Sequence, residues 1–211
     1  MTDAVLRLSD DLALADLRTF LTRAASVNRD GSVRIMAAER TLAMTVGIMD
    51  APMVTGMRVS LLAEPAQLDV VVPLAALLDR LARPDRQTLP VPPQQVQAPW
   101  AGISAPRQGW SRVGEVAVTD LAQVAAGGID AVAEGAGGSA GAHAVADLRH
   151  RVWSLPMLHG TRAPSGMAFA AQTLGFLDST RDSTAVLFGT GRWLRLSTQL
   201  GHVLHRGTML S

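Results

Sequence analysis

The spacing of apolar residues changes along the first eighty residues. Residues 4–8 fit a short edge strand, and Ser9-Asp10-Asp11 then supplies side chains that can cap a helix. Apolar residues follow at intervals of three or four, which predicts one buried helix face before Asn28-Arg29-Asp30-Gly31 ends the pattern. That face comprises Leu14, Leu17, Leu21 and Ala24 or Ala25.

From residue 33 the period falls to two. Apolar residues alternate with others at 33, 35 and 37 and again from 42 to 48, on the far side of Glu39-Arg40. This pattern predicts an antiparallel hairpin with one face on a core, followed by two more strands at 58–63 and 68–72. Pro73 then opens a short helix with a leucine face, which Pro84 ends.

Residues 84–111 contain six prolines together with Trp100 and Trp110. This proline spacing excludes a helix or a central strand and predicts an extended connector. Two interpretations of its tryptophans are open. In the first, mostly buried indoles fasten the connector to the folded domains, and in the second they form a recognition surface for a partner.

The remaining hundred residues predict helices followed by strands. Thr119-Asp120 can cap a helix that Gly127-Gly128 weakens or breaks, and residues 135–141 form a glycine-rich, flexible loop. Further helices are expected at 142–153 and after Pro164-Ser165. Strand patterns at 185–188, 193–196 and 201–205 then indicate a terminal sheet. Within it Leu194 and Leu196 should pack on the core, with Trp193 and Arg195 nearer the surface.

These patterns predict the α+β class. The N-terminal domain, residues 1–83, would be an antiparallel sheet with flanking helices, and the connector would occupy 84–111. The C-terminal domain, 112–211, would be helical and closed by a small β-sheet or hairpin.

The order of elements in the first 85 residues resembles one half-domain of a DNA sliding clamp. The stretch Val70-Val71-Val72-Pro73-Leu74, a valine-rich strand feeding a short helix, carries this likeness. The resemblance implies repeated half-domains and basic inner helices, yet the helix expected at 12–26 has Arg18 and Arg23 offset by Asp11 and Asp16. The whole chain also resembles uncharacterised two-domain actinobacterial proteins, a likeness that implies no activity and no functional residues.

Composition narrows the chemistry. All nineteen basic residues are arginine, and the chain has no lysine, cysteine or tyrosine. Schiff-base lysines, thiol nucleophiles, thiolate metal sites and disulfides are therefore excluded. The spacing of the five histidines matches no metal motif, so we expect no metal and no cofactor. With no apolar run long enough to cross a membrane and no secretory signal, we expect a cytoplasmic protein.

Charge is concentrated near the end of the chain. Residues 142–211 hold seven arginines against three acidic residues, and all five histidines. Three helices and a hairpin in residues 119–206 resemble a winged-helix module, which implies nucleic-acid contacts by the basic residues of that region. The candidates are Arg149, Arg151, Arg192, Arg195 and Arg206.

Three functions therefore remain open. The first is a non-enzymatic interaction or regulatory protein that binds a protein partner or assembles as a homo-oligomer. The second is a nucleic-acid-binding protein, and the third is an enzyme with an Arg/His site such as Arg149-His150-Arg151. If the five candidate arginines share one face, nucleic-acid binding is favoured, whereas scattering favours the interaction protein.

Overall fold

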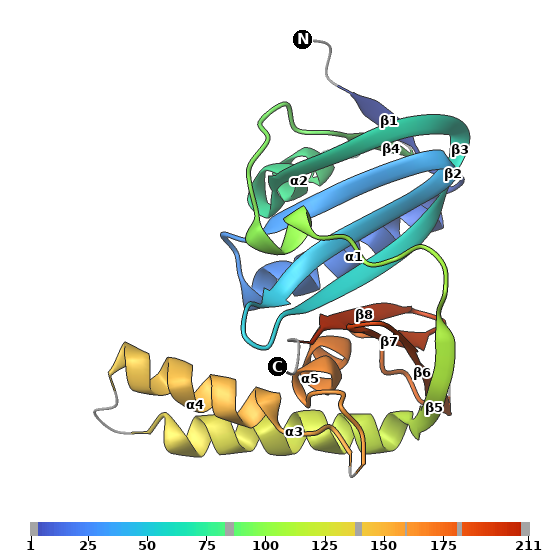
Figure 1. Cartoon of the computed structure of the whole chain (residues 1–211). Coiled ribbons are helices and arrows are strands. Elements are labelled where there is room, and N and C mark those ends of the chain that lie inside the picture. The colour runs from blue at the N-terminus through green and yellow to red at the C-terminus, as the bar shows by residue number, and fades with distance from the viewer. Residues whose placement is uncertain (1–3, 83–86, 138–140, 159, 181–182, 208–211) are drawn as a thin grey trace. The chain divides into compact units, whose positions relative to one another are not determined.

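The computed structural model of the chain describes residues 4–82, 87–137, 141–158, 160–180 and 183–207. They divide into two compact units. Unit 1 is Met1–Ile48 with Met57–Ser104, and unit 2 is Met49–Gly56 with Ala105–Ser211. Both units contain helices and strands (Figure 1), which confirms the mixed class predicted from the sequence.

Unit 1 is a long hairpin with helices. Its elements are β1 (Val5–Arg7), α1 (Asp11–Val27), β2 (Ser32–Met49), β3 (Val54–Pro73), α2 (Leu74–Leu81), β4 (Thr88–Pro90) and the 3₁₀ turn η1 (Pro99–Gly102). The ends of β2 and β3 at residues 49 and 54–56 belong to unit 2. Figure 1 shows β2 and β3 crossing over α1, and β1 pairs with β4 in a sheet of two strands.

Helix α1 begins where the sequence predicts. The Asp10 carboxylate accepts a hydrogen bond of 2.8 Å from the Ala13 amide, and this bond lowers the pKa of Asp10. The buried face includes Leu14, Leu17 and Leu21 as expected, together with Phe20. The N-terminal helix and its packing are therefore confirmed.

The four strands expected between residues 33 and 72 are in fact two long ones. No turn forms at Glu39-Arg40, because β2 continues through it to Met49. Glu39 has φ +52°, and the alternating buried positions are odd-numbered before it (33, 35, 37) and mainly even-numbered after it (42, 44, 46, 48), with Ala43 the exception. An irregularity of this kind inserts one residue into a strand and mimics a hairpin in the sequence pattern. Likewise β3 continues through residues 64–67, since the φ of Pro65 suits an extended chain.

Helix α2 follows Pro73 directly and buries Leu74, Leu77 and Leu81, as predicted. Pro84, expected to end it, lies outside the described residues. Residues 87–104 belong to unit 1, where Leu89 of β4 pairs with Leu6 of β1, and residues 105–111 belong to unit 2.

Unit 2 combines a four-stranded antiparallel sheet with helices. Its elements are β5 (Ser111–Ala117), α3 (Val118–Gly135), α4 (Ala142–Ser154), α5 (Gly166–Thr173), β6 (Thr184–Thr190), β7 (Trp193–Thr198) and β8 (Gly201–Arg206). Hydrogen bonding pairs β2 with β3 and orders the strands of unit 2 as β8-β7-β6-β5. In unit 2, α3 and α5 lie on one face of β5–β8 (Figure 1), and α4 packs on α3 and α5.

Gly127-Gly128 does not break its helix, contrary to one of the expected outcomes. Helix α3 is continuous, and a methyl group at Gly128 would lie 2.3 Å from the Trp153 ring. The glycine therefore makes room for an indole that α4 presses against α3. Gly135 is similar, since a methyl group there would lie 2.6 Å from Leu148. Of the expected flexible loop, residues 138–140 lie outside the described residues.

The terminal sheet departs from expectation at one residue. Leu196 is buried, as predicted, and Leu194 is half-buried. Trp193, expected near the surface, is only 8 % exposed. The face on which it lies is not purely polar: it also carries Phe188 and the buried Leu204. The alternation of the strand predicted the face of Trp193 correctly, but not its burial, because both faces of this sheet are partly covered.

Candidate interaction surface

The side chains opposite α5 form one mixed aromatic and basic face on the unit 2 sheet. Residues directly opposite each other in an antiparallel ladder share a face. One row across the sheet is Arg112, Phe188, Arg195 and Leu204, and the adjacent row contains Trp193 and Arg206. We call this surface, with Trp110 added, the arginine face; it consists of Trp110, Arg112, Phe188, Trp193, Arg195, Leu204 and Arg206.

Arg195 lies between two aromatic rings at the centre of this face. Its guanidinium carbon is 4.7 Å from the Trp110 ring centroid and 4.6 Å from that of Phe188. Both distances fit cation–π attraction. Partial burial lowers the pKa of Arg195, but an arginine stays charged at neutral pH.

Backbone geometry holds Trp110 over the arginine. The indole Nε1 donates a hydrogen bond of 2.8 Å to the Pro106 carbonyl. Gly109 has φ +81°, a conformation that glycine adopts without steric cost, and it places the chain reversal just before the indole. Trp110 is half-buried and its ring contacts Arg195 of β7; that this contact fastens the segment to the folded domain stays a prediction.

Arg195 lies on β7 and Arg206 on β8, and Arg192 lies in the turn between β6 and β7. Arg192 Nε donates to the Gly207 carbonyl at 3.0 Å, and Arg206 lies opposite Trp193. On the same face Arg112 forms an ion pair with Glu115, the one acidic residue in the four strands of the unit 2 sheet. The surface is therefore cationic, and its single carboxylate is already paired.

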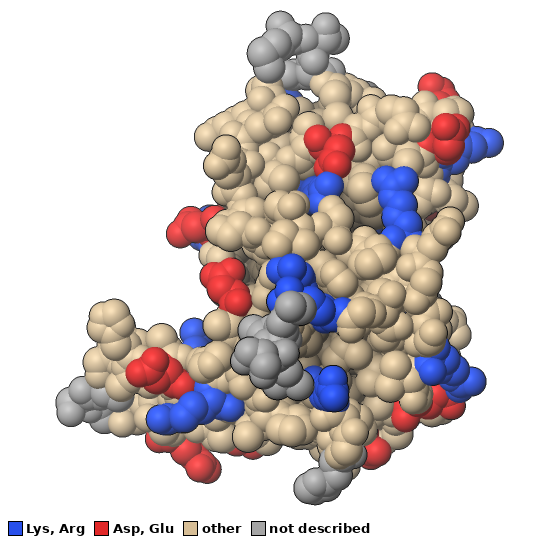
Figure 2. Space-filling model, viewed as in Figure 1, with Lys and Arg blue, Asp and Glu red and all other residues tan. Residues whose placement is uncertain are grey.

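Arg149 and Arg151 lie elsewhere, on α4, which packs against α3 and α5 on the helical side of the sheet. Figure 2 shows acidic and basic side chains interspersed over the α3 and α4 region. Helix α5, which would have to enter the major groove in a winged-helix module, has five of its eight residues buried. The winged-helix resemblance therefore has no support in the structure.

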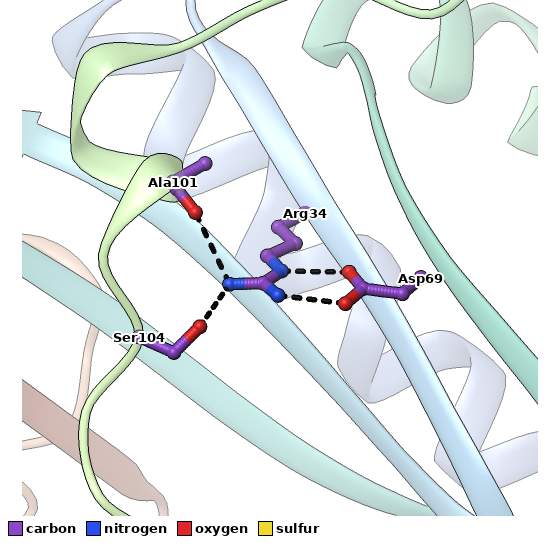
Figure 3. A network of polar contacts seen from close by, with 4 residues as sticks. All are labelled: Arg34, Asp69, Ala101 and Ser104. Carbon is purple, nitrogen blue, oxygen red and sulfur yellow. Dashed lines mark hydrogen bonds and ion pairs between the residues drawn. The ribbon is translucent and has the colours of Figure 1, made fainter.

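Trp100 packs in unit 1, beside a polar network. A methyl group at Gly47 on β2 would lie 2.6 Å from the Trp100 indole nitrogen, so the ring rests directly on that strand. Next to it Arg34 holds Asp69 in a two-bond ion pair of 2.7 Å per bond, and the same guanidinium donates to Ala101 at 3.2 Å and Ser104 at 2.5 Å (Figure 3). Hydrogen bonding to Asp69 raises the pKa of Arg34. Trp100 is half-buried and contacts β2; that it fastens residues 98–104 to this strand stays a prediction.

The arrangement closest to catalytic chemistry is a serine–histidine pair on the sheet. Ser197 Oγ lies 2.9 Å from His202 Nδ1 on the adjacent strand. Because β7 has neighbours on both sides, its amides pair within the sheet and cannot bind an oxyanion beside Ser197. His150, the histidine of the expected Arg/His site, lies 3.4 Å from Ser154 on the same helix.

The described residues form neither a metal centre nor a membrane span. Within those ranges, no three His, Cys, Asp or Glu side chains gather as they would around a metal ion. None of the described helices has both the length and the apolar character of a membrane span.

The sequence pattern did not single out three residues of this surface, Arg112, Phe188 and Leu204, although for Phe188 the sequence contained a signal. Counting outward from the β6–β7 turn pairs Thr190 with Trp193, and therefore Phe188 with Arg195. The contribution of Trp110 had no such signal, because it comes from a segment 85 positions away from Arg195 along the chain.

Solved structures place this fold among DNA polymerase sliding clamps. The chain is similar to the polymerase III β protein of Caulobacter crescentus at 12 % identity and a TM-score of 0.54, covering 96 % of this chain and 65 % of that one. The β subunit of Pseudomonas aeruginosa matches at 13 % identity and 0.53, covering 100 % and 66 %. That of Thermotoga maritima matches at 13 % and 0.50, covering 96 % and 64 %. The chain thus spans just under two thirds of their length.

The clamp likeness predicted for the first 85 residues is therefore confirmed as a likeness of fold, and it extends over nearly the whole chain. Residues 105–210 match the model of a domain of unknown function (DUF8185), which covers half of the chain, and the protein belongs to that family. Residues 1–102 match a second domain of unknown function (DUF8010). Comparison with curated proteins gives no match.

Proposed function

We propose that this protein is a non-enzymatic interaction protein, a clamp-like scaffold that binds a protein partner on the arginine face of unit 2. The observation that carries the proposal is Arg195, a charged guanidinium held between two rings without a carboxylate partner among the described residues. Arginine and tryptophan are the residues that most often supply binding energy in protein interfaces. A cation fixed in this way loses little side-chain entropy when a partner binds.

The alternative is DNA binding, because the solved structures to which this fold is similar are subunits of DNA polymerases. Binding along DNA requires rows of cations that neutralise phosphates. The helices of this chain offer few: α1 has Arg18 and Arg23 against Asp11 and Asp16, α3 has three acidic residues and no basic one, and α4 has two arginines against Asp147. Charge on the helices therefore favours a protein partner over a nucleic acid encircled by them.

Site-specific photo-crosslinking tests the proposal. Because the chain has no lysine, lysine-reactive cross-linkers cannot sample its surface. A photoreactive residue at exposed Gln108, two positions before Trp110, should capture a defined protein in native lysate, and the same residue at exposed Ala133 on α3 should not. Replacing Trp110 with Ala should abolish capture from position 108.

Two results would overturn this function. One is an equal pattern of capture from positions 108 and 133 that Trp110→Ala leaves unchanged. The other is tight binding of duplex DNA with a steep salt dependence, which would establish the alternative. Self-capture at position 108, with a matching oligomer in native mass spectrometry, would identify the partner as a second copy of the chain.

A further inference from the structure

We propose that the partner segment bound by the arginine face is an acidic peptide, with one carboxylate docked on the guanidinium of Arg195. This inference rests on the proposed interaction function and names the chemistry of the partner. It follows from three features of the described residues: the unpaired nitrogens of Arg195, the charge of the surrounding face, and the rings that fix the guanidinium.

Arg195 has hydrogen-bonding capacity that no residue of the described ranges uses. No described residue accepts a hydrogen bond or forms an ion pair with it, and of its nitrogens only Nε is both shielded from water and unpaired. The two terminal nitrogens therefore reach solvent. They present a planar fork of N–H donors, whose geometry matches the two oxygens of a carboxylate. Arg34, in the same protein, binds Asp69 in this two-bond manner.

The surrounding charge selects an anion. Arg206 shares the face with Arg195, Arg192 lies in the turn beside it, and Glu115 is already paired with Arg112. An acidic segment approaching the sheet meets several cations and no free carboxylate among the residues of these strands. Complementary charge of this kind steers association and disfavours basic partners.

The aromatic rings favour a peptide over a single-stranded nucleic acid. Proteins that bind single strands present open aromatic faces on which bases stack. Here Trp110 and Phe188 both turn a face toward the Arg195 guanidinium. The rings thus orient a cation for a side-chain carboxylate and are not left as open stacking platforms.

Fluorescence anisotropy with the full-length protein tests the inference. The probe is a labelled dodecapeptide of alternating Glu and Ala, compared with its Lys–Ala counterpart and with labelled single-stranded and duplex DNA. Arg195→Gln should weaken binding of the acidic peptide about 10-fold or more, since a charge-assisted hydrogen bond is lost. Arg195→Lys, which keeps the charge but not the planar fork, should give an intermediate loss.

Arg149→Gln is the matched control, because it removes one exposed arginine from α4 on the other side of the sheet. It should change the affinity less than about 2-fold, as a distant surface charge does under salt screening. Melting curves should show all three variants folded.

The inference fails if the acidic peptide does not bind, if Arg149→Gln weakens binding as much as Arg195→Gln does, or if either DNA binds more tightly than the peptide. The crosslinking experiment at position 108 separates this failure from that of the proposed function. If a protein captured at position 108 binds the Arg195→Gln variant as well as the wild type, the interaction function stands. The acidic-peptide chemistry is then wrong.

Discussion

Two arginines of this chain fasten consecutive parts of the same proline-rich segment, and they do so by opposite means. In unit 1 Arg34 binds residues 101 and 104 through a polar network in which Asp69 neutralises its charge. In unit 2 Arg195 holds Trp110 by stacking, with no neutralising partner in the described ranges. The charge and the N–H donors of Arg34 are paired within the fold. Arg195 has no such partner among the described residues, so its N–H donors can bind a carboxylate of another molecule. The difference teaches which of two similar residues is structural and which is available for binding.

The same substitution at both sites tests whether Arg34 is a structural residue and Arg195 is not. Arg34→Met should destabilise unit 1 by about 2 kcal/mol, because it removes a two-bond ion pair and two further hydrogen bonds from a mostly buried guanidinium, discounted for the half-exposed Asp69. Urea unfolding combined with hydrogen exchange of residues 98–104 measures the effect. Arg29→Met, at an exposed position, is the control and should change little. An equal loss in both variants would show that the network is not stabilising.

The packing of Trp100 can be tested from the strand beneath it. Gly47→Ala should cost about 1–2 kcal/mol, since its methyl group meets the indole and forces the ring to move. The free energy of unfolding and the Trp fluorescence maximum should both change. Gly114→Ala on β5, where a methyl group meets nothing within 4 Å, serves as the control. If both variants unfold alike, Trp100 does not fasten the segment to β2.

Arg195→Met should change stability by no more than about 0.5 kcal/mol in either direction. Methionine fills much of the same volume against the two rings and removes an unpaired buried Nε, so the loss of cation–π attraction is offset. Thermal unfolding measures this value. A loss as large as that expected for Arg34→Met would mean that Arg195 is a structural residue and would remove the distinction between the two.

The smallest expected effect is a pH dependence of unit 2 that involves His205 and neither arginine. His205 Nδ1 donates a 2.9 Å hydrogen bond to the Met53 carbonyl, and burial lowers its pKa from 6.5. The unfolded chain therefore takes up the proton at a higher pH than the folded one, so stability is full above pH 6.5 and falls as the pH drops below it. His205→Gln should flatten this slope in unfolding measured between about pH 7 and pH 5. If the slope does not change in His205→Gln, another titrating group causes the pH dependence.

We predict that the glycine-rich loop at 135–141 can be shortened to two residues with little loss of stability, on one condition set by the structure. Gly135 packs against Leu148 and closes α3, so it should be kept when the loop is shortened. A variant that keeps Gly135 should melt near the wild-type temperature, because loop closure depends weakly on length, about 0.6 kcal/mol per doubling.

The features of this fold that follow from the sequence alone are local ones. The capping of α1 by Asp10, the leucine face of α2 and the hairpin register that sets Phe188 opposite Arg195 depend on side chains a few positions apart, where periods of 3.6 and 2 govern which face each occupies. The same periods misled at Glu39, where a single residue of positive φ shifted the alternation and a continuous strand resembled two.

Contacts between residues far apart in the sequence depend on the tertiary structure. Gly128 leaves space for the Trp153 ring, and Trp193 is buried on a face expected to be exposed. Arg195 stacks on Trp110, which comes from a distant segment of the chain. Each of these depends on which surfaces pack together, and packing is set by shape and burial over the whole unit, which no local period records. The sequence therefore determined the elements and the faces they present, while the fold alone decided which arginine was left with a free hydrogen-bonding edge.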